Sequence, residues 1–180
     1  MHGIIFSELK KYVVTKFGDG TWNKLLQEAG LNGKMYWSHQ IYPDEEVVAL
    51  VVTASKMTRI SVAAILEDFG EFIVPDLVKI YMIFIVSTWK TLDLLENVEE
   101  TIHKVVRMRL PGSDPARLKV RRPNRDEVII FYESPRKMCS LAKGIIRGVA
   151  KYYGETIIIQ ELKCMHRGSP SCQLRVRRKQ

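Results

Sequence analysis

The chain has 180 residues, of which 46% are apolar and 27% are charged, and its formal net charge is +8. This length suits one domain with a sizeable core, and the composition excludes a disordered or low-complexity protein. The most apolar segment, residues 80–89, has about half the length of a membrane span, and residues 1–6 lack the basic start of a signal peptide. An odd number of cysteines argues against a secreted disulfide framework. We therefore expect a cytoplasmic protein that does not enter the membrane.

The first part of the chain has the apolar spacing of helices. Helices are predicted at residues 4–17, 21–29, 44–52, 61–70, 77–88 and 91–110. Asp44 is expected to cap the third of these, because a side-chain oxygen there can accept a hydrogen bond from a free backbone N–H. Pro75 is expected to interrupt the chain between the fourth and the fifth, and residues 80–89 to form a buried helix.

From residue 111 onward the pattern changes to short β-branched runs. Strands are predicted at residues 118–121, 127–132, 155–163 and 173–178, and a helix from Pro135 to Gly154. The sequence therefore predicts an α+β fold in a single domain, residues 1–180. A helical N-terminal subdomain, about residues 1–110, packs on a C-terminal subdomain, about residues 111–180, with a four-stranded antiparallel sheet and one inserted helix (ββαββ).

Three hydrogen-bond donors stand at alternate positions where the second strand ends: Tyr132, Ser134 and Arg136. Side chains at this spacing leave a strand on the same side, so the three donors can converge on one target. Arginine offers a two-pronged fork to a carboxylate, and the two hydroxyls complete a cradle for anionic oxygens. The alternative is that Ser134 only caps the helix that starts at Pro135, which leaves the other two donors unexplained.

The histidines differ in their surroundings. His103 lies on the predicted helix 91–110 at the edge of its apolar face, beside Ile102. Taken alone, a single histidine in such a place is more often a satisfied core residue than a ligand. His2 and His39 are predicted to lie on the surface, at the terminus and in a loop.

The cysteines form a second candidate site. Cys164 and Cys172 flank the tip of the last predicted hairpin, and Cys139 precedes them on the helix. Thiolates in a reducing compartment favour a tetrahedral zinc site that is completed by a harder ligand. Glu161 is the first choice for this fourth ligand and His166 the second. The alternative is three ordinary thiols with Cys139 packed inside its helix.

Together these features resemble the heme nitric oxide/oxygen binding (H-NOX) family, the sensor domain of soluble guanylate cyclase and of bacterial standalone sensors. The combination of His103, Pro115 and the Tyr-x-Ser-x-Arg motif is specific, whereas each piece alone is weak. The matching pieces run through nearly the whole chain: residues 1–6, 21–22, 69–72, His103, Pro115, residues 132–136 and the closing hairpin.

The resemblance implies a heme b between the two subdomains, with His103 as its axial ligand and Tyr132, Ser134 and Arg136 on its propionates. Pro115 would press on the porphyrin. The other expected pocket residues are apolar: Ile5, Leu9, Ile73, Val74 and Leu141. Some bacterial members of the family carry zinc at the matching cysteines, with a histidine where this chain has Glu161.

The function that the resemblance implies is that of a gas sensor without catalytic residues of its own. It would bind nitric oxide, and also carbon monoxide, at ferrous heme and signal to a separate histidine kinase or cyclic-di-GMP enzyme. Strain along the iron–His103 bond, and its rupture, would shift the helix 91–110. Oxygen-binding members have a distal tyrosine at the position of Leu141, so this chain is expected to exclude oxygen.

Two other functions are considered. On the same fold, the cysteines could form a zinc redox switch, because thiolates around zinc can oxidise and release the metal. A basic scaffold for nucleic acid is weaker, since the basic segments 116–125 and 175–179 contain no aromatic residues for base stacking. The sequence shows no nucleophile–base pair or phosphate-binding loop, so no enzymatic site is predicted.

Overall fold

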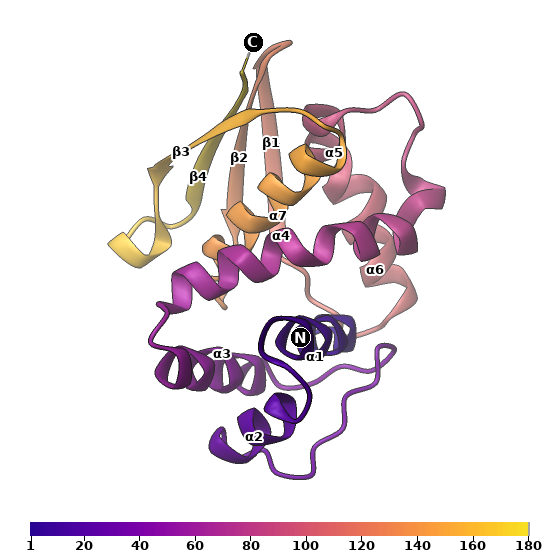
Figure 1. Cartoon of the computed structure of the whole chain (residues 1–180). Coiled ribbons are helices and arrows are strands. Elements are labelled where there is room, and N and C mark those ends of the chain that lie inside the picture. The colour runs from indigo at the N-terminus through magenta and orange to yellow at the C-terminus, as the bar shows by residue number, and fades with distance from the viewer. Residues whose placement is uncertain (180) are drawn as a thin grey trace.

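The computed structural model describes residues 1–179, and it has a helical half followed by a four-stranded sheet with one inserted helix (Figure 1). The α-helices are α1 (Gly3–Phe17), α2 (Thr21–Glu28), α3 (Asp44–Thr58), α4 (Val62–Tyr81), α5 (Thr91–Val98), α6 (Lys104–Arg109) and α7 (Cys139–Tyr152). The strands are β1 (Arg117–Asn124), β2 (Glu127–Glu133), β3 (Ile157–Lys163) and β4 (Cys172–Arg178). Three short helical turns are η1 (Met82–Phe84), η2 (Glu99–His103) and η3 (Met165–Arg167). The predicted α+β fold is confirmed.

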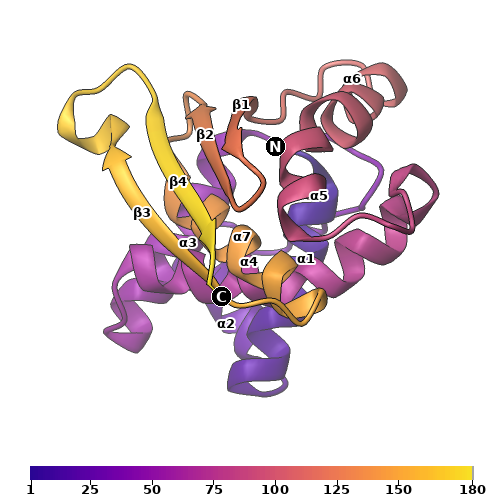
Figure 2. The same cartoon turned by 90° about the horizontal axis from the view of Figure 1, so that it is seen from above.

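The sheet is antiparallel throughout, with the strand order β1-β2-β4-β3. Its inward side chains alternate along each strand, and they include Val128 and Ile130 of β2 and Val176 of β4. These side chains pack with Ile146 of α7 and Leu92 of α5 in one apolar cluster. Helix α5 lies beside β1 (Figure 2), so the chain that carries the π-helical turn η2 runs next to the edge of the sheet.

Helices α1 to α4 enclose the larger core on the far side of α7 from the sheet (Figure 1). Phe6, Leu50 and Phe69 are its largest fully buried side chains. Within residues 1–179, no single helix combines the length and the apolar content of a membrane span. Only the pair Asp44–Thr58 and Val62–Phe84, bent by 111°, meets both criteria together.

The two halves of the molecule meet where α4 crosses α7. A Cβ atom added to Gly70 would lie 2.5 Å from the carbonyl oxygen of Leu141, and one added to Gly144 would lie 2.1 Å from that of Glu67. Neither distance is compatible with a side chain, so glycine at both positions lets the two helix backbones touch. An ion pair of 2.6 Å between Arg147 and Glu67 holds the rim of this contact.

Helix α4 corrects the sequence prediction, because it continues through Gly70 and Pro75 to Tyr81. A proline inside a helix removes one hydrogen bond and costs about 3 kcal/mol. The neighbours Val74 and Val78 are 1% and 8% exposed. Burial of each such side chain gives about 1.5–3 kcal/mol, so packing outweighs the local preference for a break.

The apolar segment 80–89 is not the buried helix that we predicted. After Tyr81 the chain makes the turn η1 and a loop, and the side chains of Met82 and Ile83 are 66% and 83% exposed. Only part of the segment, including Trp89, packs against the cluster formed by α4, α5 and α7. The segment packs against the rest of the molecule on one side only, so the apolar residues on its other sides stay exposed to solvent.

Candidate functional site

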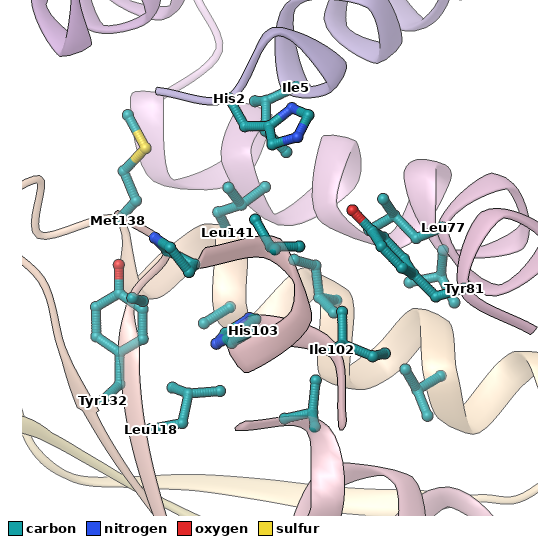
Figure 3. A pocket seen from close by; sticks show the side chains of 18 of the residues that line it. His2, Ile5, Leu77, Tyr81, Ile102, His103, Leu118, Tyr132, Met138 and Leu141 are labelled. Carbon is teal, nitrogen blue, oxygen red and sulfur yellow. The ribbon is translucent and has the colours of Figure 1, made fainter. Parts of the chain in front are cut away.

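A cavity of about 260 Å³ is enclosed by elements from both halves of the molecule, and apolar side chains form most of its wall (Figure 3). One side comes from α1, α4 and α7, and the other from α5, η2, α6 and the entry to β1. Four of the expected pocket residues border this cavity: Ile5, Val74, Pro115 and Leu141.

Two of the expected pocket residues, Leu9 and Ile73, do not border the cavity. They are 2% and 0% exposed and belong to the core of the N-terminal helices. Ile73 precedes Val74 by one position, which turns it roughly 100° around the helix and away from the cavity. Leu9 lies one turn of α1 beyond Ile5 and packs into that same core.

Polar groups from distant parts of the chain also border the cavity. They are His2, Tyr81, His103, Ser113, Asp114, Tyr132 and Arg136. Three residues of the predicted site, His103, Tyr132 and Arg136, are thus brought to one cavity. Tyr132 is 5% exposed, and burial raises the pKa of its phenol, so the hydroxyl remains a neutral donor.

Ser134, unlike Tyr132 and Arg136, does not border the cavity. It is 2% exposed, and its Oγ accepts a hydrogen bond of 3.3 Å from the backbone N–H of Arg136. It does not cap a helix, because α7 begins at Cys139 and not, as we predicted, at Pro135. Lys137, with φ of 50°, interrupts the helical backbone before that point. The alternative that Ser134 only caps the helix starting at Pro135 is therefore wrong.

Arg136 is held in place before it meets any ligand. Its Nη1 donates a hydrogen bond of 3.0 Å to Asp44, and its other terminal nitrogen donates to the carbonyl of Asp114. Burial opposes ionisation of Asp44, but hydrogen bonds from the N-terminal ammonium and Arg136 outweigh it and lower the pKa of this carboxyl. A guanidinium has five N–H groups, so Arg136 keeps free donors for a carboxylate on the cavity side.

Asp44 is the first residue of α3, and Pro43 is the N-cap residue of that helix. The predicted capping role of Asp44 is therefore wrong.

His103 is the last residue of η2, a π-helical turn that divides the predicted helix 91–110 into α5 and α6. Such turns inside helices are often found at functional sites. The Nδ1 atom of His103 is 3.0 Å from Oε2 of Glu99, which also accepts a 3.1 Å hydrogen bond from the Leu118 N–H. Burial opposes ionisation of Glu99, but hydrogen bonds from His103 and Arg107 prevail and lower its pKa to about 2.

His2 was missed by sequence reasoning, which placed it on the surface. Its Nδ1 caps α1 by accepting a hydrogen bond of 3.1 Å from the Ile4 N–H, and its backbone bridges to Ile41. Burial, and then the nearby N-terminal charge, lower the pKa of its imidazole. Figure 3 shows it on the α1 side of the cavity next to Ile5. No local pattern could reveal this, because the bridge to Ile41 is a contact between distant segments.

Tyr81 was also missed, although a signal for it exists. Val74, Leu77, Val78 and Tyr81 recur at the spacing of one helix face, and all four border the cavity. Because we expected the helix to be interrupted at Pro75, we did not recognise that these four residues share one helix face.

The three cysteines form a compact cluster beside β2: Cys139 begins α7, Cys164 directly follows β3, and Cys172 begins β4. Their sulfur atoms lie within 4.8 Å of one another, and all three residues are buried. The Sγ distances are 3.9 Å from Cys139 to Cys164 and 4.0 Å from Cys164 to Cys172. Tetrahedral bonds of about 2.3 Å to zinc would place two sulfurs roughly 3.8 Å apart, so the spacing fits this metal. Burial, reinforced by the neighbouring thiols, raises the pKa of Cys139 to about 12.

The two candidates for a fourth ligand lie outside this cluster in the part of the chain that the structure describes. The carboxylate of Glu161 is 2.6 Å from Arg167 and 3.4 Å from Lys143, so two cations hold it. His166 makes a 2.7 Å hydrogen bond from Nε2 to the carbonyl of Lys137. That nitrogen must carry the proton, which leaves the lone pair on Nδ1 for a metal.

Comparisons with known proteins agree with this architecture. The family model described as Haem-NO-binding matches residues 2–161. The H-NOX protein of S. oneidensis, solved in the Fe(II)NO state, is 25% identical with a TM-score of 0.93, covering 100% of both chains. A mutant H-NOX of T. tengcongensis shares the fold, with 20% identity and a TM-score of 0.87 over 100% of this chain and 98% of that one.

A curated relative, Soluble guanylate cyclase 89Db of Drosophila melanogaster, is 27% identical over 158 residues, which make up 86% of this chain and 24% of that protein. The chain thus spans about a quarter of the length of the curated relatives that it matches. The family model covers most of the chain, and the fold agrees throughout its described length. The chain belongs to the Haem-NO-binding, or H-NOX, family.

Proposed function

We propose that the chain binds heme b in the cavity between its two halves and senses nitric oxide there. The observation that carries the proposal is that one histidine, one phenol and one buried guanidinium, those of His103, Tyr132 and Arg136, border a single cavity with otherwise largely apolar walls. This is the donor set that a five-coordinate heme with two propionates needs. Bound heme would supply a ferrous iron that takes up nitric oxide or carbon monoxide.

Each residue has a separate task in this proposal. His103 offers Nε2 to the iron, because Glu99 occupies its Nδ1. Arg136 donates charge-assisted hydrogen bonds to a propionate, and Tyr132 adds its neutral hydroxyl. Ser134 supports the turn that orients the arginine. Pro115 borders the cavity and is proposed to press on the porphyrin.

The selectivity follows from the apolar residues on the α1, α4 and α7 side. Bound dioxygen takes on superoxide character and depends on a hydrogen-bond donor, whereas nitric oxide and carbon monoxide bind well without one. Leu141 stands where oxygen-binding members of the family carry a tyrosine, and Ile5 and Val74 provide no donor either. The polar groups on this side are His2 and Tyr81, and Nδ1 of His2 already accepts from the Ile4 N–H. From the apolar side chain at the tyrosine position we infer that oxygen is excluded. Solved H-NOX structures from S. oneidensis carry nitric oxide or carbon monoxide on ferrous iron, which supports the same ligands here.

We propose that the signal leaves through the segment 99–109. Loss of the iron bond would free His103 and let η2 and α6 move. None of the residues of these two elements is fully buried, so they are easier to displace than the core helices. A histidine kinase or a cyclic-di-GMP enzyme is the partner that the family resemblance suggests.

We further propose a zinc ion at Cys139, Cys164 and Cys172. The measured sulfur spacing supports it, and binding would displace the thiol protons. For the fourth ligand the contacts favour His166 over Glu161, because the histidine has a free ring nitrogen and the carboxylate is held by two cations.

The two other functions receive less support. All three cysteines are buried, so an oxidant has little access to them, which argues against the zinc redox switch. Several arginines of the basic segments are ion-paired, among them Arg122 with Asp93 and Arg178 with Asp126, so less positive charge is available to nucleic acid.

The test of the proposed function is spectroscopic. Protein supplied with heme should bind about one heme per chain through a histidine, and its ferrous form should give the spectra of nitric oxide and carbon monoxide complexes but form no stable oxygen complex in air. Metal analysis of the same sample should find about one zinc per chain. A chain that takes up no heme would overturn the proposal.

A further inference from the structure

We propose that Glu99 is a positioning residue that strengthens the bond between His103 and the heme iron; this inference rests on the proposed heme function. The carboxylate accepts from Nδ1 of His103 at 3.0 Å, and the two residues stand at the two ends of the π-helical turn η2. The contact therefore belongs to the same short segment that carries the iron ligand.

The carboxylate of Glu99 is held from three directions. Oε2 contacts both His103 and the backbone N–H of Leu118, the latter at 3.1 Å, and Oε1 pairs with Arg107. The side chains of Glu99 and His103 are only 20% and 21% exposed. Leu118 lies near the start of β1, so the sheet itself fixes the acceptor. A freely rotating surface glutamate would have none of these constraints.

The hydrogen bond has a defined effect on the imidazole. It keeps the proton on Nδ1 and the lone pair on Nε2, which is the atom that the iron needs. A negatively charged acceptor also draws the Nδ1 proton toward itself, so Nε2 becomes a stronger electron donor. A stronger donor would stabilise ferric over ferrous iron and would strengthen the bond between the iron and His103.

Arg107 has the opposite influence. Its guanidinium neutralises part of the charge on the other oxygen of the same carboxylate, which weakens the pull on the imidazole proton. Glu99 and Arg107 together therefore give the iron–histidine bond an intermediate strength, weaker than with Glu99 alone and stronger than with a neutral acceptor. When that bond breaks, His103 remains tethered to Glu99, whose link to Leu118 connects it to the sheet.

The experiment uses heme-loaded full-length protein and two readouts: the iron–histidine stretching frequency of the ferrous form by resonance Raman spectroscopy, and the ferric/ferrous reduction potential. Glu99→Gln should lower the stretching frequency and raise the potential, because the acceptor loses its charge. Arg107→Gln should shift both in the opposite direction. Glu100→Gln is the matched control, since Glu100 is 73% exposed and, among residues 1–179, pairs only with Lys104.

The outcomes separate this inference from the proposed function. Wild-type protein that binds no heme would overturn both. Heme-loaded wild type in which Glu99→Gln leaves both readouts unchanged would overturn the role of Glu99 alone. If Glu99→Gln fails to retain heme, the Arg107→Gln shift decides: a higher frequency with a lower potential supports the inference, and no shift or the reverse refutes it.

Discussion

Asp44 and Arg136 form an ion pair, with Oδ2 and Nη1 3.0 Å apart, that joins the start of α3 to the turn before α7. The arginine side chain is 8% exposed, so its orientation is set by this contact and not by solvent. An anchored side chain loses little conformational freedom when it binds a carboxylate, which favours binding. The pair thus prepares the polar end of the cavity for the anionic edge of a ligand.

The first prediction concerns this anchor and its supporting hydroxyl. Arg136→Ala should weaken heme retention by about 10- to 100-fold, the loss of a charge-assisted contact, and Ser134→Ala by about 2- to 10-fold. The rate of heme transfer to an acceptor apoprotein measures both. Equal losses, or a larger loss in Ser134→Ala, would contradict the role given to the guanidinium.

The second prediction concerns the iron ligand. His103→Gly should yield folded protein that loses heme, and added imidazole should restore heme binding, because the free base replaces the deleted side chain. Heme content and ferrous absorption spectra measure this directly. His39→Gly, at an exposed loop position that does not border the cavity, is the control and should retain heme. Normal retention and spectra in His103→Gly without imidazole would rule out this ligand.

The third prediction concerns the thiol cluster. Cys164→Ser should reduce zinc to well below one ion per chain and lower the melting temperature, because metal binding stabilises the folded state. Of the two candidates for the fourth ligand, His166→Ala should weaken zinc binding and Glu161→Gln should leave it unchanged. Full zinc occupancy in Cys164→Ser would reject the site, and a loss caused only by Glu161→Gln would assign the ligand to the carboxylate.

The fourth prediction concerns oxygen. The wild-type ferrous protein should form no stable oxygen complex, and Leu141→Tyr should form one, because a phenol at this position of the cavity wall supplies the missing donor. Ser140→Tyr is the control, since one step along α7 turns a side chain roughly 100° away. A stable oxygen complex in the wild type would contradict the prediction, and His2→Leu would then show whether His2 is the donor.

The sequence predicted the elements of the site that depend on short-range pattern. Tyr132 and Arg136 both border the cavity, as the alternate spacing predicted, although Arg136 lies in the turn after β2 and Ser134 between them does not border it. Helical periodicity placed His103 at the edge of an apolar face. Contacts between residues far apart in the sequence could not be predicted from local patterns. The Leu118 N–H meets Glu99 only because β1 runs beside the π-helical turn, and the bridge between His2 and Ile41 has no local signature.

The errors of prediction have one physical origin. Local preferences at Pro75, Pro135 and Asp44 pointed to a break, a start and a cap. Tertiary contacts decided otherwise at Pro75 and Asp44, and the backbone conformation of Lys137 did so after Pro135. Buried valines carry α4 past its proline, a left-handed backbone at Lys137 delays α7, and an ion pair with Arg136 occupies the carboxylate of Asp44. Propensity is a weak preference that packing routinely overrides.

The backbone contact at Gly70 and Gly144 also determines where the molecule can bend. With no side chains between them, main-chain atoms of α4 and α7 are in close contact, so we expect the two helices to move as one rigid body. In the proposed function, a displacement caused by a gas at the iron would therefore be taken up by η2 and α6, which contain no fully buried residue. A rigid contact at the two glycines would confine that motion to one side of the protein.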